Sequence, residues 1–240
     1  MRIYGINPVL EALRGGRVTA LRVSPRADDR LTEIVRLADQ RGIPVRRAQA
    51  NELDRFAQGG VHQGVVADIK DVAAVSVEDL VVAAAGAPLL VVLDGIEDPH
   101  NVGAILRTVD AAGAHGVVRQ SRHAARLDGA AAKASAGAVT HVRVADVVNI
   151  ARALESLKDA GVWTVGFAGD AAKRYDEVDY TLPTAIVLGA EGTGLRRLVR
   201  ERCDWLVSIP MRGHVQSLNV SVTAGIALFE AVRQRNFAVR

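Results

Sequence analysis

The chain has 240 residues, of which 49% are hydrophobic and 24% are charged, and a formal net charge of +3. This composition is typical of a folded globular protein and excludes a disordered chain. No apolar run reaches the roughly 20 residues of a membrane-spanning helix, no apolar signal-peptide core follows Met1, and the single cysteine, Cys203, excludes an internal disulfide. We therefore expect a cytoplasmic protein with no membrane partner.

The positive charge is unevenly distributed. Residues 1–69 hold 11 Lys and Arg against 8 Asp and Glu, whereas the remaining residues hold 19 of each sign. A basic surface in the first segment favours binding of phosphates, although an ordinary solvated basic face explains this feature equally well. The arginines concerned are Arg14, Arg17, Arg22, Arg26, Arg30, Arg41, Arg46 and Arg47.

The first 69 residues alternate between helical and strand patterns. Asn7 as a cap and Pro8 at the first helical position predict a helix that ends at Gly15. Together the patterns predict a small α/β domain over residues 1–69, followed by a partly helical linker over residues 70–87. The further expected elements are a strand at Ala20–Val23, a helix at Leu31–Arg41, a helix at Asn51–Phe56 and a strand at Val65–Ile69.

From residue 88 to residue 240, short apolar runs alternate with helical patterns. Such runs, bounded by turn residues, predict an α/β domain with a parallel sheet that helices cover on both faces. Ligands of these sheets bind at the carboxyl ends of the strands. The expected strands are Leu89–Leu93, Gly116–Val118, His141–Val144, Val162–Gly166, Ala185–Leu188 and Leu206–Ile209.

Two of these strand ends carry polar residues. After Leu93 a helix begins near Asn101, with Arg107 about two turns later; taken alone, this pattern indicates a helix cap and a surface side chain. After Leu188 the glycine-rich turn contains Gly189 and Glu191, and glycines allow close backbone approach to a ligand. Neither a GxGxxG dinucleotide fingerprint nor a GxxxxGK phosphate loop occurs in the chain.

A third strand end precedes the last helix of the chain. The strand ends at Ile209, and a helix begins around Ser217 to Asn219. A helix cap explains Ser217, but not the polar cluster of Ser217, Asn219 and Ser221. Beside this cluster lies an apolar stripe, suited to a core or a subunit interface, at Leu218, Val222, Ile226 and Phe229.

In this order, the three segments resemble the three sequence motifs of the SpoU, or TrmH-like, family of RNA ribose 2'-O-methyltransferases in the SPOUT superfamily. Within this family, the chain resembles in particular the bacterial 23S rRNA guanosine 2'-O-methyltransferases. The motif matches are NVGAILR at 101–107, LGAEGTGL at 188–195, IPM at 209–211 and SLNVSVTAGI at 217–226. The first domain resembles the family's substrate-binding domain, related in shape to ribosomal protein L30, through YGINPVLEAL at 4–13 and VHQGVVA at 61–67.

This resemblance implies methyl transfer from S-adenosylmethionine to the ribose 2'-hydroxyl of a guanosine in 23S rRNA or a ribosomal precursor. It also implies that residues 88–240 form a domain with a deep trefoil knot, through which the protein is a homodimer. The reactive residues would be Asn101, Arg107, Glu191, Ser217 and Asn219, and backbone groups at Gly189, Ile209 and Leu218 would hold the methyl donor.

The family suggests Arg107 for removal of the hydroxyl proton. An arginine with a pKa above about 12 is a poor base, so we expect Arg107 to orient the hydroxyl or a phosphate and to stabilise the developing alkoxide. Glu191 and Asn101 would then position Arg107 or the ribose. No metal is expected, since the histidines lack metal-ligand spacing with one another or with Cys203.

Three other functions remain open from the sequence: the same chemistry on tRNA, a non-catalytic RNA-binding ribosome-assembly factor, and methylation that confers antibiotic resistance. The joint presence of the five reactive residues argues against the assembly factor. The chain departs from many relatives in two places, which concern substrate-facing loops. Arg119 and Gln120 replace a common Pro-Lys pair, and His214 and Gln216 stand where smaller residues are common.

Overall fold

The computed structural model describes residues 1–240 except 26–28, 71–73, 123, 128 and 239–240, so Arg26 and residues 71–73 of the expected linker lie outside the described residues. No described helix is long and apolar enough to cross a membrane. The chain forms two compact units. The first comprises Met1–Ala73, Val102–Arg107 and Arg126–His141, and the second comprises Ala74–Asn101, Thr108–Ala125 and Val142–Arg240.

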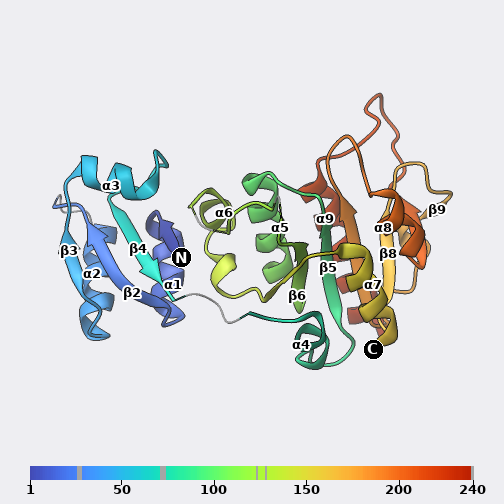
Figure 1. The fold of residues 1–240 in the computed structure, drawn as a ribbon, viewed down its shortest axis with the longest axis horizontal. Coiled ribbons are helices and arrows are strands. Elements are labelled where there is room, and N and C mark those ends of the chain that lie inside the picture. Colours follow the sequence, from blue (N-terminus) through green and yellow to red (C-terminus); the bar gives the residue numbers. More distant parts are fainter. Residues whose placement is uncertain (26–28, 71–73, 123, 128, 239–240) are drawn as a thin grey trace. The chain divides into compact units, whose positions relative to one another are not determined.

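The first unit contains a four-stranded sheet with the order β1-β4-β2-β3 (Figure 1). Strand β4 is antiparallel to β1 and β2, whereas β3 is parallel to β2. The strands are β1 (Arg2–Tyr4), β2 (Val18–Val23), β3 (Val45–Arg47) and β4 (Val65–Ile69). The helices of this unit are α1 (Ile6–Arg14), α2 (Asp29–Gln40), α3 (Ala50–Ala57) and α6 (Gly129–Ala134), with a 3-10 turn at Ala138–Thr140.

The two faces of this sheet are covered differently. Because successive side chains point to opposite faces, Ile3 and Leu21 lie on one face, where both are buried and where α1 contacts β1, β2 and β4. On the other face, Tyr4 and Val66 pack against Leu53 of α3. Helix α3 covers part of that second face, and Gly129 at the start of α6 approaches Tyr4. The same face also carries polar side chains, at Arg2, Asp68, Arg22 and Arg46.

The prediction that Asn7 caps the first helix is wrong. Helix α1 begins at Ile6, its N-cap is Gly5 with φ +94°, and Pro8 is its third residue. Gln63 replaces the missing cap, since its Oε1 accepts a hydrogen bond of 3.1 Å from the backbone N of Ile6. One of the free N–H groups of the first turn is thereby satisfied from a distant loop.

The second unit contains a seven-stranded sheet with the order β7-β6-β5-β10-β8-β11-β9. All of its described strand pairings are parallel, as the sequence predicted. The strands are β5 (Leu89–Asp94), β6 (Gly116–Gln120), β7 (Val144–Val147), β8 (Trp163–Phe167), β9 (Lys173–Arg174), β10 (Thr184–Gly189) and β11 (Trp205–Ser208).

Helices cover both faces of this sheet, which explains why every residue of β5 is buried. On one face, Leu154 of α7 packs in a cluster with Leu90 and Val187. On the other face α9 packs on β10, and Gly225 of α9 approaches Thr108 of α5. The helices are α4 (Val77–Val82), α5 (Pro99–Ala111), α7 (Ile150–Asp159), α8 (Arg197–Arg202) and α9 (Val220–Ala238), with a 3-10 turn at Tyr175–Glu177. The middle of α5, Val102–Arg107, belongs to the first unit.

The strand predicted at His141–Val144 is wrong for most of its length. Gly137, with φ +98°, opens a 3-10 turn at Ala138–Thr140, and the backbone N of His141 still donates to Ala138. The strand β7 therefore begins only at Val144. The other expected strands of the sheet are present, with each end at most two residues from its predicted position.

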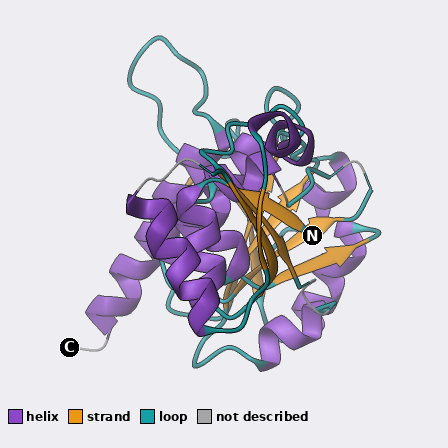
Figure 2. Ribbon diagram, turned by 90° about the vertical axis from the view of Figure 1, so that its left-hand side faces the viewer, coloured by secondary structure: helices purple, strands orange, loops and turns teal. Residues whose placement is uncertain are grey.

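The connection between β11 and α9, residues 209–219, is a long loop beyond the carboxyl end of β11. In Figure 1 it is coloured orange-red and rises above the strands, and Figure 2 shows it in teal. Its backbone has an uncommon property: within the described chain, residues 209–218 make no backbone hydrogen bond. Their N–H and C=O groups are therefore available to a ligand.

Candidate active site

The site lies at the carboxyl ends of β5 and β10, which are neighbours in the sheet. Gly189 of β10 is in register with Asp94 of β5. From β5 the chain builds the sheet outward through β6 and β7, and then crosses to β8 on the other side of β10. Such a reversal of strand order opens a crevice at the carboxyl edge of a parallel sheet, which is where ligands bind.

Three of the predicted reactive residues form one hydrogen-bonded cluster. The Nδ2 of Asn219 donates to Glu191 Oε1 at 2.7 Å and to Asn101 Oδ1 at 2.9 Å. The Nδ2 of Asn101 donates to the same Glu191 oxygen at 3.2 Å. Because an ionised carboxylate only accepts hydrogen bonds, both amides present their NH₂ groups to it. The cluster joins residues from α5, the β10–α8 loop and the start of α9.

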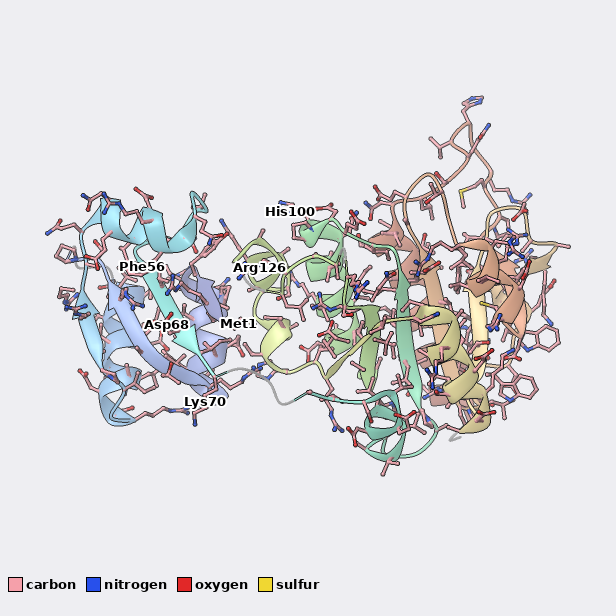
Figure 3. All side chains as sticks on the ribbon, in the orientation of Figure 1. Met1, Phe56, Asp68, Lys70, His100 and Arg126 are labelled. Atoms are coloured by element: carbon pink, nitrogen blue, oxygen red, sulfur yellow. The ribbon has the colours of Figure 1, made fainter. Side chains whose placement is uncertain are left out.

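Each member of the cluster is fixed by the element that carries it. Asn101 is buried in the first turn of α5, whose N-cap is Asp98; Asn101 is therefore not the cap. His100, labelled in Figure 3, marks the start of this helix. Asn219 Oδ1 accepts hydrogen bonds from the backbone N and the Oγ of Ser221. Asn219 thus caps α9 with its oxygen and binds Glu191 with its nitrogen.

The loop that carries Glu191 is a tight turn that only glycine allows. A Cβ atom on Gly189 would lie 2.2 Å from the carbonyl carbon of Gly194, and the backbone N of Gly194 donates to Ala190 O at 2.8 Å. Gly192 and Gly194 have positive φ angles, a conformation that side chains disfavour. The loop therefore folds back over the end of β10.

An ion pair that the sequence reasoning missed anchors the far end of this loop. Asp94 is fully buried at the end of β5, and its Oδ2 accepts a hydrogen bond from the backbone N of Arg196 at 2.8 Å. Its Oδ1 contacts the Arg196 guanidinium through Nε at 2.6 Å and Nη2 at 2.5 Å. A carboxylate directly after an apolar strand was the available signal, because a buried charge needs a partner.

Two adjoining cavities, one of them lined by cluster residues, share five wall residues: Phe167, Gly169, Ser217, Leu218 and Thr223. One has a volume of about 470 Å³ and the other of about 560 Å³, within the roughly 300 to 1,000 Å³ typical of small-molecule sites. The first is lined by the loop 207–218, including Ile209, Pro210 and Met211. The second is lined by the β10 end and its loop, including Gly189, Glu191 and Asn219.

These walls fit S-adenosylmethionine. Ile209 and Leu218 give an apolar surface for a base, and the unpaired backbone groups of residues 209–218 can bind its polar edge. Gly189 lines the second cavity with its backbone, because the place of a side chain at this position is filled by Gly194 of the same loop. Of the residues predicted to hold the donor, Ile209 and Gly189 line one cavity each and Leu218 lines both. Ser217, predicted as reactive, also lines both.

Arg107 is not joined to the cluster. Its side chain is exposed on α5, and within the described chain it makes no hydrogen bond or ion pair. It lies six residues after Asn101, roughly 9 Å further along the helix and about 120° around it. The two side chains therefore leave different faces of α5.

The residues that depart from the family pattern fall into two groups. His214 and Gln216 line the cavity of about 470 Å³, so they belong to the candidate donor site. Arg119 instead forms an ion pair with Asp146 at 2.8 Å. No group of side chains among the described residues can hold a metal ion. Burial raises the pKa of the Cys203 thiol to about 12, so this thiol is a poor nucleophile.

Comparison with known proteins agrees with this geometry. The sequence model of the SpoU rRNA Methylase family matches residues 88–229, and that of the RNA 2'-O ribose methyltransferase substrate-binding family matches residues 2–74. The 23S rRNA (guanosine-2'-O-)-methyltransferase RlmB of Pseudomonas syringae pv. tomato is 44% identical over 241 residues, covering 98% of this chain and 96% of that protein.

Solved structures show the same fold. The SpoU methyltransferase AviRb from Streptomyces viridochromogenes, crystallised with the cofactor AdoMet, has a TM-score of 0.83 and 27% identity and covers 99% of this chain and 91% of its own. The AdoMet-bound rRNA methyltransferase from Sinorhizobium meliloti has a TM-score of 0.80 and 26% identity, covering 97% and 86%.

These matches confirm the predicted fold class and the prediction of a methyltransferase with S-adenosylmethionine as cofactor. Together the two family models cover most of the chain, the substrate-binding model at residues 2–74 and the methylase model at residues 88–229. The chain belongs to the SpoU rRNA methylase family.

Proposed function

We propose that this enzyme transfers a methyl group from S-adenosylmethionine to the ribose 2'-hydroxyl of a guanosine in 23S rRNA, in the cytoplasm. The observation that carries the proposal is the cluster of Asn101, Glu191 and Asn219, of which Glu191 and Asn219 line the cavity of about 560 Å³. The substrate is proposed from the similarity to RlmB, which covers 98% of the chain.

The chain's main task in this reaction is orientation. The sulfonium methyl of the donor is already activated, so a ribose oxygen must be placed in line with it at near-attack distance. Ile209, Leu218 and Gly189 would hold the donor, and the cluster would hold the ribose. Glu191 Oε1 accepts both amides, which leaves Oε2 to accept the hydrogen bond of the 2'-hydroxyl.

Arg107 and Ser217 complete the proposed reactive set. The exposed guanidinium of Arg107 would bind a substrate phosphate or stabilise the alkoxide that forms as the hydroxyl proton passes to Glu191 Oε2 or to solvent water. Ser217, at the wall of both cavities, would donate or accept a hydrogen bond between donor and ribose. With Asn101, Glu191 and Asn219, these are the five residues to which we assign the reaction.

The proposed assembly is a homodimer through the carboxyl-terminal part, whose fold we expect to carry the family's trefoil knot. Support comes from α9, where Val222 and Phe229, two turns apart, are 49% and 51% exposed. Large apolar side chains in a row on one helix favour burial against another surface. We keep the proposed division into a substrate-binding domain (residues 1–69), a linker (70–87) and a methyltransferase domain (88–240).

The test is methyl transfer from labelled S-adenosylmethionine to unmodified 23S rRNA and to total tRNA, with the product mapped by mass spectrometry. We expect label on the 2'-oxygen of one 23S guanosine and none with the Arg107→Ala variant. Label on tRNA alone would overturn the substrate and keep the chemistry. Donor binding without transfer to either RNA, or to ribosomal precursor particles, would favour an assembly factor.

A further inference from the structure

One face of the amino-terminal sheet concentrates arginine side chains around a single aromatic ring. Strand register places Arg2 beside Asp68, and Arg22 beside both Val66 and Arg46. These side chains share the face that α3 covers only in part, and Phe56 of α3 lies at the border. Figure 3 labels Phe56 and Asp68. We define the arginine face as Arg2, Arg22, Arg46, Phe56 and Asp68.

Most of the arginine face is held rigidly by its own contacts. The guanidinium carbons of Arg2 and Arg22 lie 4.6 and 4.1 Å from the centroid of the Phe56 ring. Both arginines also form ion pairs with Asp68, at 2.9 and 2.5 Å. Hydrogen bonds from these arginines hold the pKa of Asp68 below its usual range, although burial alone would raise it. The carboxylate is therefore charged and fully engaged.

Arg46 is the exception on this face. It is exposed, and within the described chain its guanidinium makes no hydrogen bond or ion pair. It stands directly beside Arg22 across the β2–β3 pairing, and like charges side by side on a sheet are destabilising. The face thus carries three guanidinium groups and one carboxylate, and the described residues supply no counter-ion for Arg46.

Other arginines of the basic segment are bound to the protein itself. Arg47 donates to the backbone oxygen of Ser24 at 3.0 Å, and Arg41 donates to the backbone oxygen of Leu13. Arg14 forms an ion pair with Glu11 at 2.7 Å. These three guanidinium groups have partners within the protein, whereas Arg46 on the arginine face has none among the described residues.

We propose that the arginine face binds an unpaired segment of the RNA substrate. Arg46 and the exposed edge of Arg2 take backbone phosphates, and a base stacks on the layer formed by Phe56 and its two guanidinium groups. This inference rests on the proposed function and names the surface through which the first unit grips RNA. Unpaired RNA is bound in this way, by base stacking on aromatic rings and guanidinium planes together with cationic contacts to phosphates.

The charge and chemistry of the face favour RNA over a protein partner. A protein interface presents more apolar side chains at its centre, whereas Phe56 is the one large apolar side chain among the five residues that define this face, and two guanidinium groups already contact its ring. A duplex offers phosphates but no free base. We therefore expect the face to bind a single strand, which offers both a free base and phosphates, more tightly than a duplex. An acidic peptide offers charge but no base to stack.

Equilibrium binding of the full-length protein to a 23S rRNA transcript tests the proposal, with the Arg46→Glu variant compared to Arg36→Glu. Arg36 is a matched control because it is exposed on α2 and, within the described chain, has no side-chain partner. We expect Arg46→Glu to weaken binding about tenfold and to reduce the slope of log K against log salt by about one. Arg36→Glu should change affinity less than twofold.

A second variant tests the stacking layer. Phe56→Leu keeps an apolar side chain on α3 against the cluster that contains Leu53 and removes the ring. We expect it to weaken binding of a short single-stranded RNA about tenfold and to leave binding of a duplex of the same sequence unchanged. A competition experiment adds an acidic peptide to the protein bound to the single strand or to the duplex. No displacement of either RNA agrees with the proposal, and displacement by a peptide that binds more tightly than RNA would overturn it.

Equal effects of Arg46→Glu and Arg36→Glu, or no effect of either, would overturn the arginine face as the RNA surface. That failure is distinguishable from failure of the proposed function. If the unchanged enzyme methylates 23S rRNA and the two variants behave alike, only the assignment of the surface is wrong. If the unchanged enzyme methylates no RNA while it binds RNA through Arg46, the proposed function is wrong and the surface stands.

Discussion

The two polar regions of this molecule differ in whether their charged side chains have partners within the protein. At the strand-end cluster, Glu191 receives two amide donors, and the buried Asp94 is matched by Arg196. On the arginine face, Asp68 engages Arg2 and Arg22, while Arg46 beside them is unmatched within the described chain. We infer that the first region is built to fix geometry and the second to attract a polyanion.

The difference shows what each region demands of the fold. Fixing geometry requires partners from several elements, and the cluster joins α5, α9 and the β10–α8 loop through side chains with both ends engaged. Attracting phosphates requires only exposed charge, which a short strand such as β3 can supply. The following predictions break or sharpen this comparison, in order of decreasing effect.

The largest effect is expected for Arg107. Replacement by alanine should lower the methyl-transfer rate by about 10³-fold, because a positioned charge at a developing alkoxide contributes about this much. The measurement is single-turnover transfer with saturating donor and RNA. Arg107→Lys distinguishes charge from shape: near-normal turnover would refute a need for the planar guanidinium, and the exposed Arg36 on α2 supplies the control replacement.

Asn219→Ala should lower the same rate by about 100-fold, because it removes the shorter of the two amide hydrogen bonds to Glu191 and the hydrogen bond to Asn101 Oδ1. The substitution also removes the N-cap of α9. The control is therefore Asn149→Ala, which removes a comparable N-cap from α7 and does not touch the cluster. Both variants should lose roughly 1 kcal/mol of stability. If Asn149→Ala slowed transfer as much as Asn219→Ala, the cluster would have no role beyond capping.

Arg196→Ala leaves the buried Asp94 without its guanidinium. We expect the free energy of unfolding to fall by about 3 kcal/mol, because removal of one partner strands a buried charge. The control is Arg197→Ala, whose pair with Glu201 is exposed and worth at most about 1 kcal/mol. Chemical denaturation measures both. Adding Asp94→Asn to Arg196→Ala should recover part of the lost free energy of unfolding, because it removes the stranded charge. A further large loss would show that the stranded charge is not the cause.

The smallest effect concerns the acid stability of the amino-terminal sheet. The pKa of Asp68 is lowered in the folded protein by its arginine partners, against burial. A depressed folded pKa stabilises the protein above the unfolded value near 3.9 and loses that contribution as pH falls through the folded pKa. Asp68→Asn should therefore flatten the stability profile below about pH 4. An unchanged acid profile would show that Asp68 makes no such contribution.

Much of the second sheet was predictable from the sequence, because parallel strands buried on both faces give short continuous apolar runs. In the first sheet, the strand at Val65–Ile69 was predicted with its observed ends. The first helix start was not, since its cap function comes from Gln63, more than 50 residues away. The His141–Val144 error has a similar origin: a left-handed Gly137 opens a turn that apolar patterning does not reveal.

The site was predictable in its membership more than in its geometry. The motif resemblance selected Asn101, Glu191 and Asn219, which the structure joins, and Arg107, which it leaves apart on α5. Local sequence reasoning had favoured Asn101 as a helix cap, because a cap is the commoner use of that residue type at a helix start. Asp94 was overlooked, since only three-dimensional structure shows that Arg196 reaches it.

The single-turnover rate of methyl transfer as a function of 23S rRNA concentration tests most directly whether the two regions have separate tasks. Asn219→Ala should lower the maximal rate by about 100-fold and leave the half-saturating RNA concentration unchanged. Arg46→Glu should raise that concentration about tenfold and leave the maximal rate unchanged. If both variants changed the same parameter, the division between a region that fixes geometry and a region that binds RNA would be contradicted.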